Sequence, residues 1–170
     1  MQGIILIGFM GAGKTSIGRV LAKKTGIKHI DLDEKILEEI GMSIDQYFDL
    51  YGQGAFREKE TEVLRKYLGN RLIISTGGGI ILKAENRDLL KEMERVVYLK
   101  TSPQVFLSRI KEDTSTIRPL TISKPPEEII EIFQERISLY EESANMVVGT
   151  DGARPEEIAN EILYSLEEKK

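Results

Sequence analysis

GFMGAGKT, residues 8–15, is a phosphate-binding loop of the pattern G-x-x-x-x-G-K-[ST]. The apolar, β-branched run before it, Gly3 to Ile7, suits a buried strand. The residues after it, Ser16 to Thr25, carry apolar side chains on one helical face and stop at Gly26. Strand, glycine loop and helix follow one another in the order that this motif requires. A chance glycine-rich turn therefore explains the pattern poorly.

This loop predicts a binding site for a nucleoside triphosphate. Glycines let backbone N–H groups point at phosphate oxygens, and the helix start adds partial positive charge. The Lys14 ammonium can reach the outer phosphates, and the Thr15 hydroxyl can bind Mg²⁺. We expect Lys14 to act in catalysis. The residues expected to contact the ATP phosphates are Gly11, Ala12, Gly13, Lys14, Thr15 and Ser16.

Composition narrows the class of protein. With 170 residues, 41% of them hydrophobic and 31% charged, the chain predicts a single globular domain over residues 1–170. A net charge of −4 gives no basic field for nucleic acid. The lack of cysteine excludes disulfides and thiol nucleophiles, and the lone His29 predicts a structural role. No apolar run approaches a membrane span or a signal peptide, so we expect a cytoplasmic protein.

Short apolar runs alternate with helical patterns along the chain. The expected strands are 4–7, 29–32, 72–75, 95–99 and 145–148. The expected helices are 15–24, 33–40, 43–51, 54–68, 84–93, 103–110, 126–142 and 155–166. This alternation predicts an α/β fold of three layers, α/β/α, around a parallel sheet, with ligands at the carboxyl ends of the strands. The polar stretch 112–124 breaks the pattern and is either a lid loop or disordered, and we favour a lid.

Two acidic residues follow the second expected strand. Strand alternation would send Asp31 and Asp33 to the same side, where they could hold Mg²⁺ and orient a hydroxyl group. The alternative is that Asp33 caps a helix. The third strand leads to Ser75 and not to the acidic residue that is usual there. Asp31 is therefore the best candidate for the acidic partner of the metal.

Glycine and arginine residues mark further candidates. Three glycines at 77–79 allow a ligand to approach the backbone closely, or form a plain tight turn. Glu60, three residues after Arg57, either braces its guanidinium or makes a surface ion pair, and residue physics alone favours the surface pair. Arg136 lies in an expected helix, where it either binds a ligand or lies on a solvent-exposed helix face. A mobile Arg118 in the 112–124 loop could close over phosphates.

A set of motifs occurs in fixed order: GFMGAGKT at 8–15, DLD at 31–33, FREKE at 56–60, TGGG at 76–79, IRPL at 117–120, the Arg136–Tyr140 spacing and TDGARPEE at 150–157. Together they resemble the shikimate kinase family over nearly the whole chain. The resemblance implies a P-loop kinase fold with a five-stranded parallel sheet of order 2-3-1-4-5. It also implies transfer of the γ-phosphoryl group of ATP to the 3-hydroxyl of shikimate, a step of aromatic amino-acid biosynthesis, with Mg²⁺ as cofactor.

The resemblance also implies a role for each matching residue. On the ATP side, Lys14 and the loop backbone would hold phosphates, Thr15 and Asp31 would serve Mg²⁺, Arg118 would close with the lid, and Arg109 and Arg154 would flank the adenine. On the shikimate side, Asp33 would bind hydroxyls as base or orienter, and the carboxylate would be held by Arg57, Arg136 and the backbone of Gly77, Gly78 and Gly79. The partners implied are ATP and shikimate, without nucleic acid or membrane, and we expect a monomer.

Other functions on the same fold remain open at this point. A nucleoside kinase would need an aromatic pocket for a base and no carboxylate clamp. Gluconate, also a carboxylated polyol, is harder to reject on physical grounds. A nucleotide-dependent switch or an inactive binding module would have no need for Asp33, Arg57 and Arg136 together.

Overall fold

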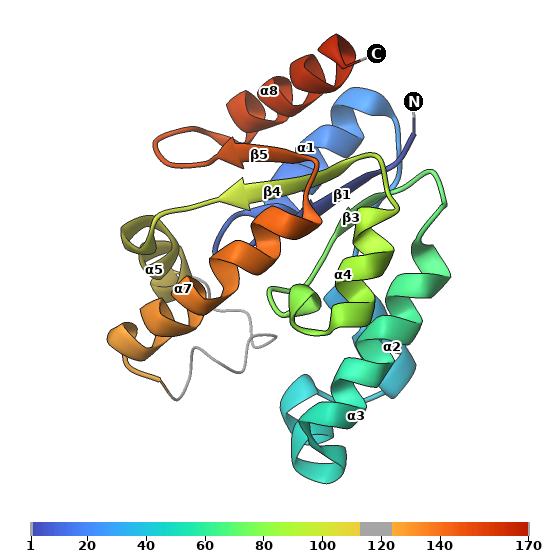
Figure 1. Cartoon of the computed structure of the whole chain (residues 1–170), viewed down its shortest axis with the longest axis vertical. Coiled ribbons are helices and arrows are strands. Elements are labelled where there is room, and N and C mark those ends of the chain that lie inside the picture. Colours follow the sequence, from blue (N-terminus) through green and yellow to red (C-terminus); the bar gives the residue numbers. More distant parts are fainter. Residues whose placement is uncertain (1, 113–123, 170) are drawn as a thin grey trace.

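The computed structural model describes residues 2–112 and 124–169. In this part of the chain, five parallel strands form one sheet in the order β2-β3-β1-β4-β5 (Figure 1). The strands are β1 (Ile4–Ile7), β2 (His29–Asp31), β3 (Ile73–Ser75), β4 (Val96–Lys100) and β5 (Met146–Gly149). The predicted fold class and strand order are confirmed.

The central strand β1 sets the register of the sheet. Ile5 lies opposite Ile74 of β3 on one side and opposite Val96 of β4 on the other. Because the strands are parallel, their carboxyl ends meet at one edge of the sheet. The phosphate loop, the end of β2 and the glycines at 77–79 all lie at this edge.

Helices cover both faces of the sheet, as Figure 1 shows. Helices α1 (Lys14–Thr25) and α8 (Pro155–Glu168) pack with Ile4 and Leu6 of β1 in one apolar cluster. Ile5 and Ile7 face the other cluster, which includes side chains of α4 (Ala84–Lys91) and α7 (Pro126–Ser143). Each buried Ile or Leu contributes about 1.5–3 kcal/mol. The two clusters therefore fix the strands whose ends carry the site.

The remaining helices border the carboxyl ends of the strands. They are α2 (Leu32–Ile40), α3 (Ile44–Tyr67), the 3₁₀ turn η1 (Ile80–Leu82) and α5 (Pro103–Glu112). The two helices expected at 43–51 and 54–68 are present as the two parts of α3, which a kink at Gly52 separates. Gly52 adopts φ 83° and ψ 169° there, a non-helical conformation that glycine tolerates and that interrupts the helix.

Most of the expected lid at 112–124 falls outside the described residues. Glu112 ends α5 and Lys124 lies just before α7, whereas Arg118 belongs to the part that is not described. Within residues 2–112 and 124–169, no helix is both long enough and apolar enough to cross a membrane.

Candidate active site

A cleft of about 1020 Å³ lies at the carboxyl ends of β1, β2 and β3. Its walls come from the phosphate loop, the β2–α2 junction, α3, the segment after β3 and α7. The predicted site residues that line it are Gly13, Lys14, Thr15, Asp31, Asp33, Arg57, Gly77, Gly78, Gly79 and Arg136. Segments far apart in sequence thus bring most of the predicted residues into one space.

The start of α1 is suited to an external anion. Gly13 is the N-cap, no side chain caps the helix, and its first turn holds no acidic residue. The first N–H groups of a helix lack intrahelical acceptors and carry partial positive charge. The first turns of α2, α3, α4, α7 and α8 each contain an acidic side chain that offsets this charge. At α1 the charge remains available for phosphate.

Two cationic side chains hold the phosphate loop. The Lys14 ammonium is buried and donates to the carbonyl oxygens of Gly8 (2.7 Å) and Phe9 (2.9 Å). Arg109 of α5 donates from Nη1 to the carbonyl oxygens of Gly11 and Ala12, both at 3.1 Å. Because a phosphate oxygen is a stronger acceptor than a carbonyl, the Lys14 ammonium can exchange these contacts for a nucleotide.

The predicted metal ligands touch one another. Thr15 Oγ1 donates to Asp31 Oδ2 at 2.6 Å. Asp31 Oδ1 accepts from the backbone N–H groups of Asp33 (3.0 Å) and Glu34 (3.3 Å). Mg²⁺ prefers oxygen ligands and commonly takes one or two from the protein and the rest from phosphates and water. This pair fits a nucleotide-bound Mg²⁺, and among the described residues no group of three or more His, Cys, Asp or Glu could hold a metal.

The expected strand alternation of Asp31 and Asp33 is wrong. β2 ends at Asp31, and Leu32 already begins α2, so it is Asp31 that caps the helix. Asp33 still reaches the cleft, because the first turn of α2 sets it beside Gly77. A Cβ atom on Gly77 would lie 2.7 Å from Asp33 Oδ1, so glycine leaves the room that this carboxylate occupies.

The Arg57–Glu60 pair is a brace with a buried carboxylate and not a surface ion pair. Arg57 Nη1 donates to Glu60 Oε1 at 2.9 Å, and the Glu60 side chain is only 1% exposed. Burial raises the pKa of Glu60, while the Arg57 charge and hydrogen bond and the Arg136 charge act in the opposite direction. A carboxylate packed in this way holds the Arg57 guanidinium in one place, directly against Gly79.

Arg136 is likewise buried, at 7% exposure, and not on a solvated helix face. Its guanidinium carbon lies 5.7 Å from the centre of the Phe9 ring, an attractive cation–π geometry. Since Arg136 also acts on the pKa of Glu60, the two arginines and this carboxylate form one cluster. With all three groups ionised, the cluster carries a net charge of +1, from two arginines and one carboxylate.

Ser75 stands at the end of β3, where an acidic residue is usual. Its hydroxyl donates to the Lys14 carbonyl oxygen at 2.8 Å, so His29 Nε2, 2.8 Å away, must donate to Ser75 Oγ. Burial lowers the pKa of His29, which keeps the ring neutral and fits the structural role expected for it. Because the Ser75 hydroxyl is bound to the start of α1, Asp31 remains the acidic group beside the expected metal position.

The two arginines expected near adenine lie in different settings. Arg109 contacts the phosphate loop, as described above. Arg154 follows β5 at the start of α8, where its side chain is 79% exposed and 3.4 Å from Glu157. Its backbone N–H donates to Glu157 Oε2 at 2.7 Å, which caps the helix. For both Arg109 and Arg154 the contact with adenine stays a prediction.

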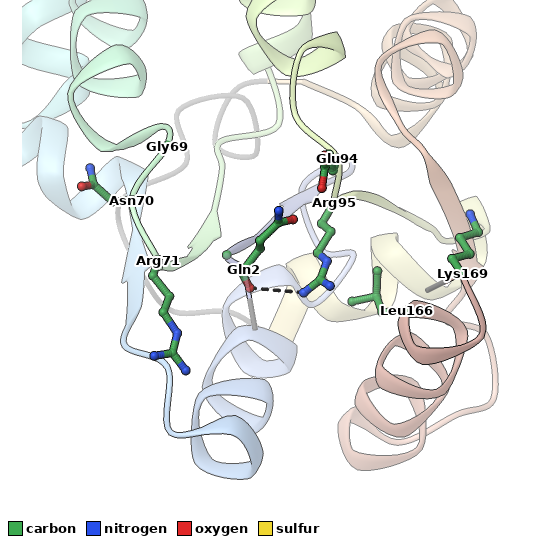
Figure 2. A pocket seen from close by; sticks show the side chains of 9 residues that line it. Gln2, Gly69, Asn70, Arg71, Glu94, Arg95, Leu166 and Lys169 are labelled. Carbon is green, nitrogen blue, oxygen red and sulfur yellow. Dashed lines mark hydrogen bonds between the residues drawn. The ribbon is translucent and has the colours of Figure 1, made fainter.

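A second cavity, of about 980 Å³, lies at the opposite edge of the sheet (Figure 2). It is lined by residues that precede β1, β3 and β4 and by the end of α8, including Gln2, Arg71, Arg95 and Lys169. Arg95 Nη1 there donates to the Gln2 carbonyl oxygen at 3.4 Å. None of the predicted site residues lines this cavity, and it adjoins the amino ends of the strands. The chemistry of the site belongs to the cleft at the carboxyl ends.

The sequence motifs do not reveal the apolar side chains that form one wall of the cleft. Ile44, Phe48 and Phe56 of α3 line it, and the Phe48 and Phe56 rings lie 4.9 Å apart. The spacing of Ile44 and Phe48 by four residues was a signal for a shared helical face. Periodicity alone could not tell whether that face meets the core or a ligand.

Comparison with known proteins gives consistent matches. The family model described as "Shikimate kinase" matches residues 10–167. The shikimate kinase of Enterococcus faecalis is 51% identical over 168 residues, covering 99% of this chain and 100% of that protein. Two solved structures cover nearly the whole chain: shikimate kinase from Acinetobacter baumannii in complex with shikimate (TM-score 0.93, 35% identity, 100% of this chain and 95% of the other) and shikimate kinase from Aquifex aeolicus (0.84, 36%, 99% and 98%).

Proposed function

Since the chain belongs to the shikimate kinase family, we propose that it transfers the γ-phosphoryl group of ATP to the 3-hydroxyl of shikimate. The products are shikimate 3-phosphate and ADP, on the route through chorismate to aromatic amino acids. One observation carries the proposal: a phosphate loop, the Asp33 carboxylate, the partly buried Arg57 and the buried Arg136 line a single cleft. The solved relative that binds shikimate supports the same acceptor.

The donor half of the cleft would bind ATP. The loop backbone at Gly11, Ala12 and Gly13, with the N–H groups at the start of α1 up to Ser16, would hold the phosphates, and Lys14 would bind the outer ones. Arg109 supports the loop from α5, while Arg118 and Arg154 keep their proposed contacts with phosphates and adenine. Mg²⁺, held by Thr15 and Asp31, would neutralise charge on the β- and γ-phosphates when bound.

The acceptor half has the chemistry of a carboxylated polyol. The cluster of Arg57, Arg136 and Glu60 holds two guanidinium groups and one carboxyl group, so it is cationic and would attract a substrate carboxylate. The backbone of Gly77, Gly78 and Gly79 runs from Asp33 at one end to Arg57 at the other. Shikimate would therefore lie with its carboxylate on the arginines and its hydroxyls at Asp33.

Phosphoryl transfer asks the protein mainly for alignment and charge stabilisation. In this proposal, Asp33 accepts a hydrogen bond from the 3-hydroxyl and either removes its proton or orients it toward the γ-phosphate. Lys14 stabilises the negative charge that develops on the phosphoryl oxygens. The clamp at Arg57 and Arg136 fixes the distance between the hydroxyl and ATP, because it holds the far end of the substrate.

An ADP-release assay with alternative acceptors tests the proposal directly. Shikimate should stimulate ADP release, whereas gluconate and nucleosides should leave it at the background rate. A nucleoside would leave the arginine cluster without a counter-charge, and open-chain gluconate would lose more conformational freedom on binding than a ring. No stimulation by shikimate would refute the assignment, and stimulation by gluconate alone would move it to that acceptor.

Two further parts of the proposal concern assembly and location. The cleft is lined by residues of one chain, so we propose that a monomer is competent for the reaction, which size-exclusion chromatography of the active enzyme tests. Dependence on ATP leads us to place the enzyme in the cytoplasm, where this donor is abundant.

A further inference from the structure

Tyr140 makes a buried hydrogen bond, although the proposed reaction assigns no role to this side chain. It lies one helical turn after Arg136 on α7, and its hydroxyl donates to the Gly78 carbonyl oxygen at 2.5 Å. Burial raises the pKa of Tyr140, although the Arg136 charge and hydrogen bonding oppose this. The hydroxyl therefore stays protonated, and remains a donor, throughout the working pH range.

The Tyr140 ring is fixed by its neighbours. It stacks on the Tyr98 ring of β4, with centroids 5.0 Å apart and planes 16° from parallel, and both residues have no exposed surface. Stacking on a strand of the central sheet leaves the hydroxyl little freedom of direction. Gly78, its acceptor, packs on the other side against the phosphate loop: a Cβ there would lie 3.2 Å from Met10 N.

Glycines 77–79 need such a constraint. Glycine has the widest choice of backbone conformations, and three in succession do not fix their own N–H directions. The Gly78 carbonyl and the Gly79 N–H belong to one planar trans peptide and point in opposite directions. Holding the carbonyl on Tyr140 thus sets the direction of the Gly79 N–H beside Arg57, at the carboxylate end of the cleft.

We infer that Tyr140 is a positioning residue for shikimate: by holding the Gly78 carbonyl, it orients the Gly79 N–H that binds the substrate carboxylate beside Arg57. The inference rests on the proposed function. It assigns to Tyr140 an effect on acceptor binding that acts through Gly78 and Gly79, without contact with ATP.

Tyr140→Phe tests this, because it removes the donor and keeps the stacked ring. We expect the KM for shikimate to rise about 5- to 15-fold, the size of one buried hydrogen bond, with the KM for ATP and kcat within about twofold of wild type. Tyr98→Phe is the matched control: Tyr98 is equally buried and aromatic, yet in the described part of the chain its hydroxyl has no hydrogen-bond partner. The control should leave both KM values unchanged.

The methyl ester of shikimate separates positioning from a general loosening of the fold. Wild type should discriminate strongly against the ester. Tyr140→Phe should have a much lower kcat/KM with shikimate and a nearly unchanged kcat/KM with the ester, so that the ratio of the two values shrinks. Wild type, Tyr140→Phe and Tyr98→Phe are all assayed at a temperature well below the lowest of their three unfolding temperatures. An unchanged KM for shikimate, or equal losses with both substrates, would overturn the inference. Failure of the wild type itself to use shikimate would overturn the proposed function instead.

Discussion

Gly79→Ala is a demanding test of the acceptor end of the cleft. A Cβ at position 79 would lie 2.5 Å from Arg57 Nη1 and 2.6 Å from Nη2, so the guanidinium must retreat by about 0.9 Å to reach an ordinary contact of about 3.4 Å. Glu60 is packed too tightly to follow, since it is 1% exposed. The change therefore strains or breaks the 2.9 Å hydrogen bond between Arg57 and Glu60 and moves the proposed carboxylate clamp.

The size of the effect follows from the hydrogen bonds that the displaced guanidinium can no longer make. A hydrogen bond to a charged group is worth about 1.5–3 kcal/mol, and each 1.4 kcal/mol is a factor of ten. We expect kcat/KM for shikimate to fall by about 10- to 100-fold in an ADP-release assay. The KM for ATP should stay constant, because the nearest atoms to the added methyl group all belong to Arg57.

Gly54→Ala supplies the control with the same substitution. Gly54 lies in α3 without a positive φ, and a Cβ there would meet nothing within 4 Å. Alanine is favoured over glycine in a helix by about 1 kcal/mol, so this variant should unfold at a higher temperature with unchanged kinetics. If Gly79→Ala kept kcat/KM within twofold of wild type, Arg57 would not hold the carboxylate in the geometry described.

Three further predictions concern the acidic side chains of the cleft. Asp33→Asn should leave ATP affinity nearly intact, measured by calorimetry, and remove most phosphoryl transfer; near-normal turnover would deny Asp33 its proposed role. Asp31→Asn should raise the Mg²⁺ concentration needed for half-maximal rate, since an amide can still cap α2 but is a poorer metal ligand; an unchanged Mg²⁺ requirement would exclude Asp31 from the metal site. Because burial raises the pKa of Glu60 above 4.5, its contribution to stability is complete below that pH and is lost as the pH rises through the folded-state pKa. The urea midpoint of Glu60→Gln relative to wild type should therefore increase with pH above about 4.5, and a constant difference at all pH values would contradict this direction.

Local sequence patterns predicted the helices and strands better than they predicted which side chains are buried and what those side chains contact. The strand, loop and helix at 4–25 follow from periodicity and glycine placement, and the structure has them within a residue or two. At residues 31–33 the same alternation rule failed, because the cap at Asp31 started α2 one residue after the strand and took precedence over strand periodicity. Side-chain alternation applies only as far as the last residue of a strand. At β2 the helix cap at Asp31 sets that last residue.

Burial of Glu60 could not be read from its surroundings in sequence. An Arg and a Glu three apart on a helix occur mostly at the surface, and only the packing of α3 against the rest of the cleft removes this pair from water. The Tyr140–Gly78 contact is harder still, since 62 positions separate the two residues. The ordered set of sequence motifs nevertheless identified the residues proposed to bind the acceptor, because those residues lie within the motifs that define the family resemblance.

The charges of the cleft are arranged in an order that would fix the orientation of the proposed acceptor. Lys14 lies at the phosphate loop, Asp31 and Asp33 come next, and Arg57 lies beyond Gly79 at the far end. A substrate turned end for end would set its carboxylate against two aspartates and its hydroxyls against the arginines, so it would face repulsion at one end and an unmatched charge at the other. In the proposed mode of binding, the arginine cluster would therefore do more than add affinity. It would reject the reversed pose, so that the hydroxyl group near Asp33 is the one presented to the γ-phosphate. It follows that an acceptor without the carboxylate should be phosphorylated slowly and at more than one hydroxyl, which product analysis of the methyl ester reaction can establish.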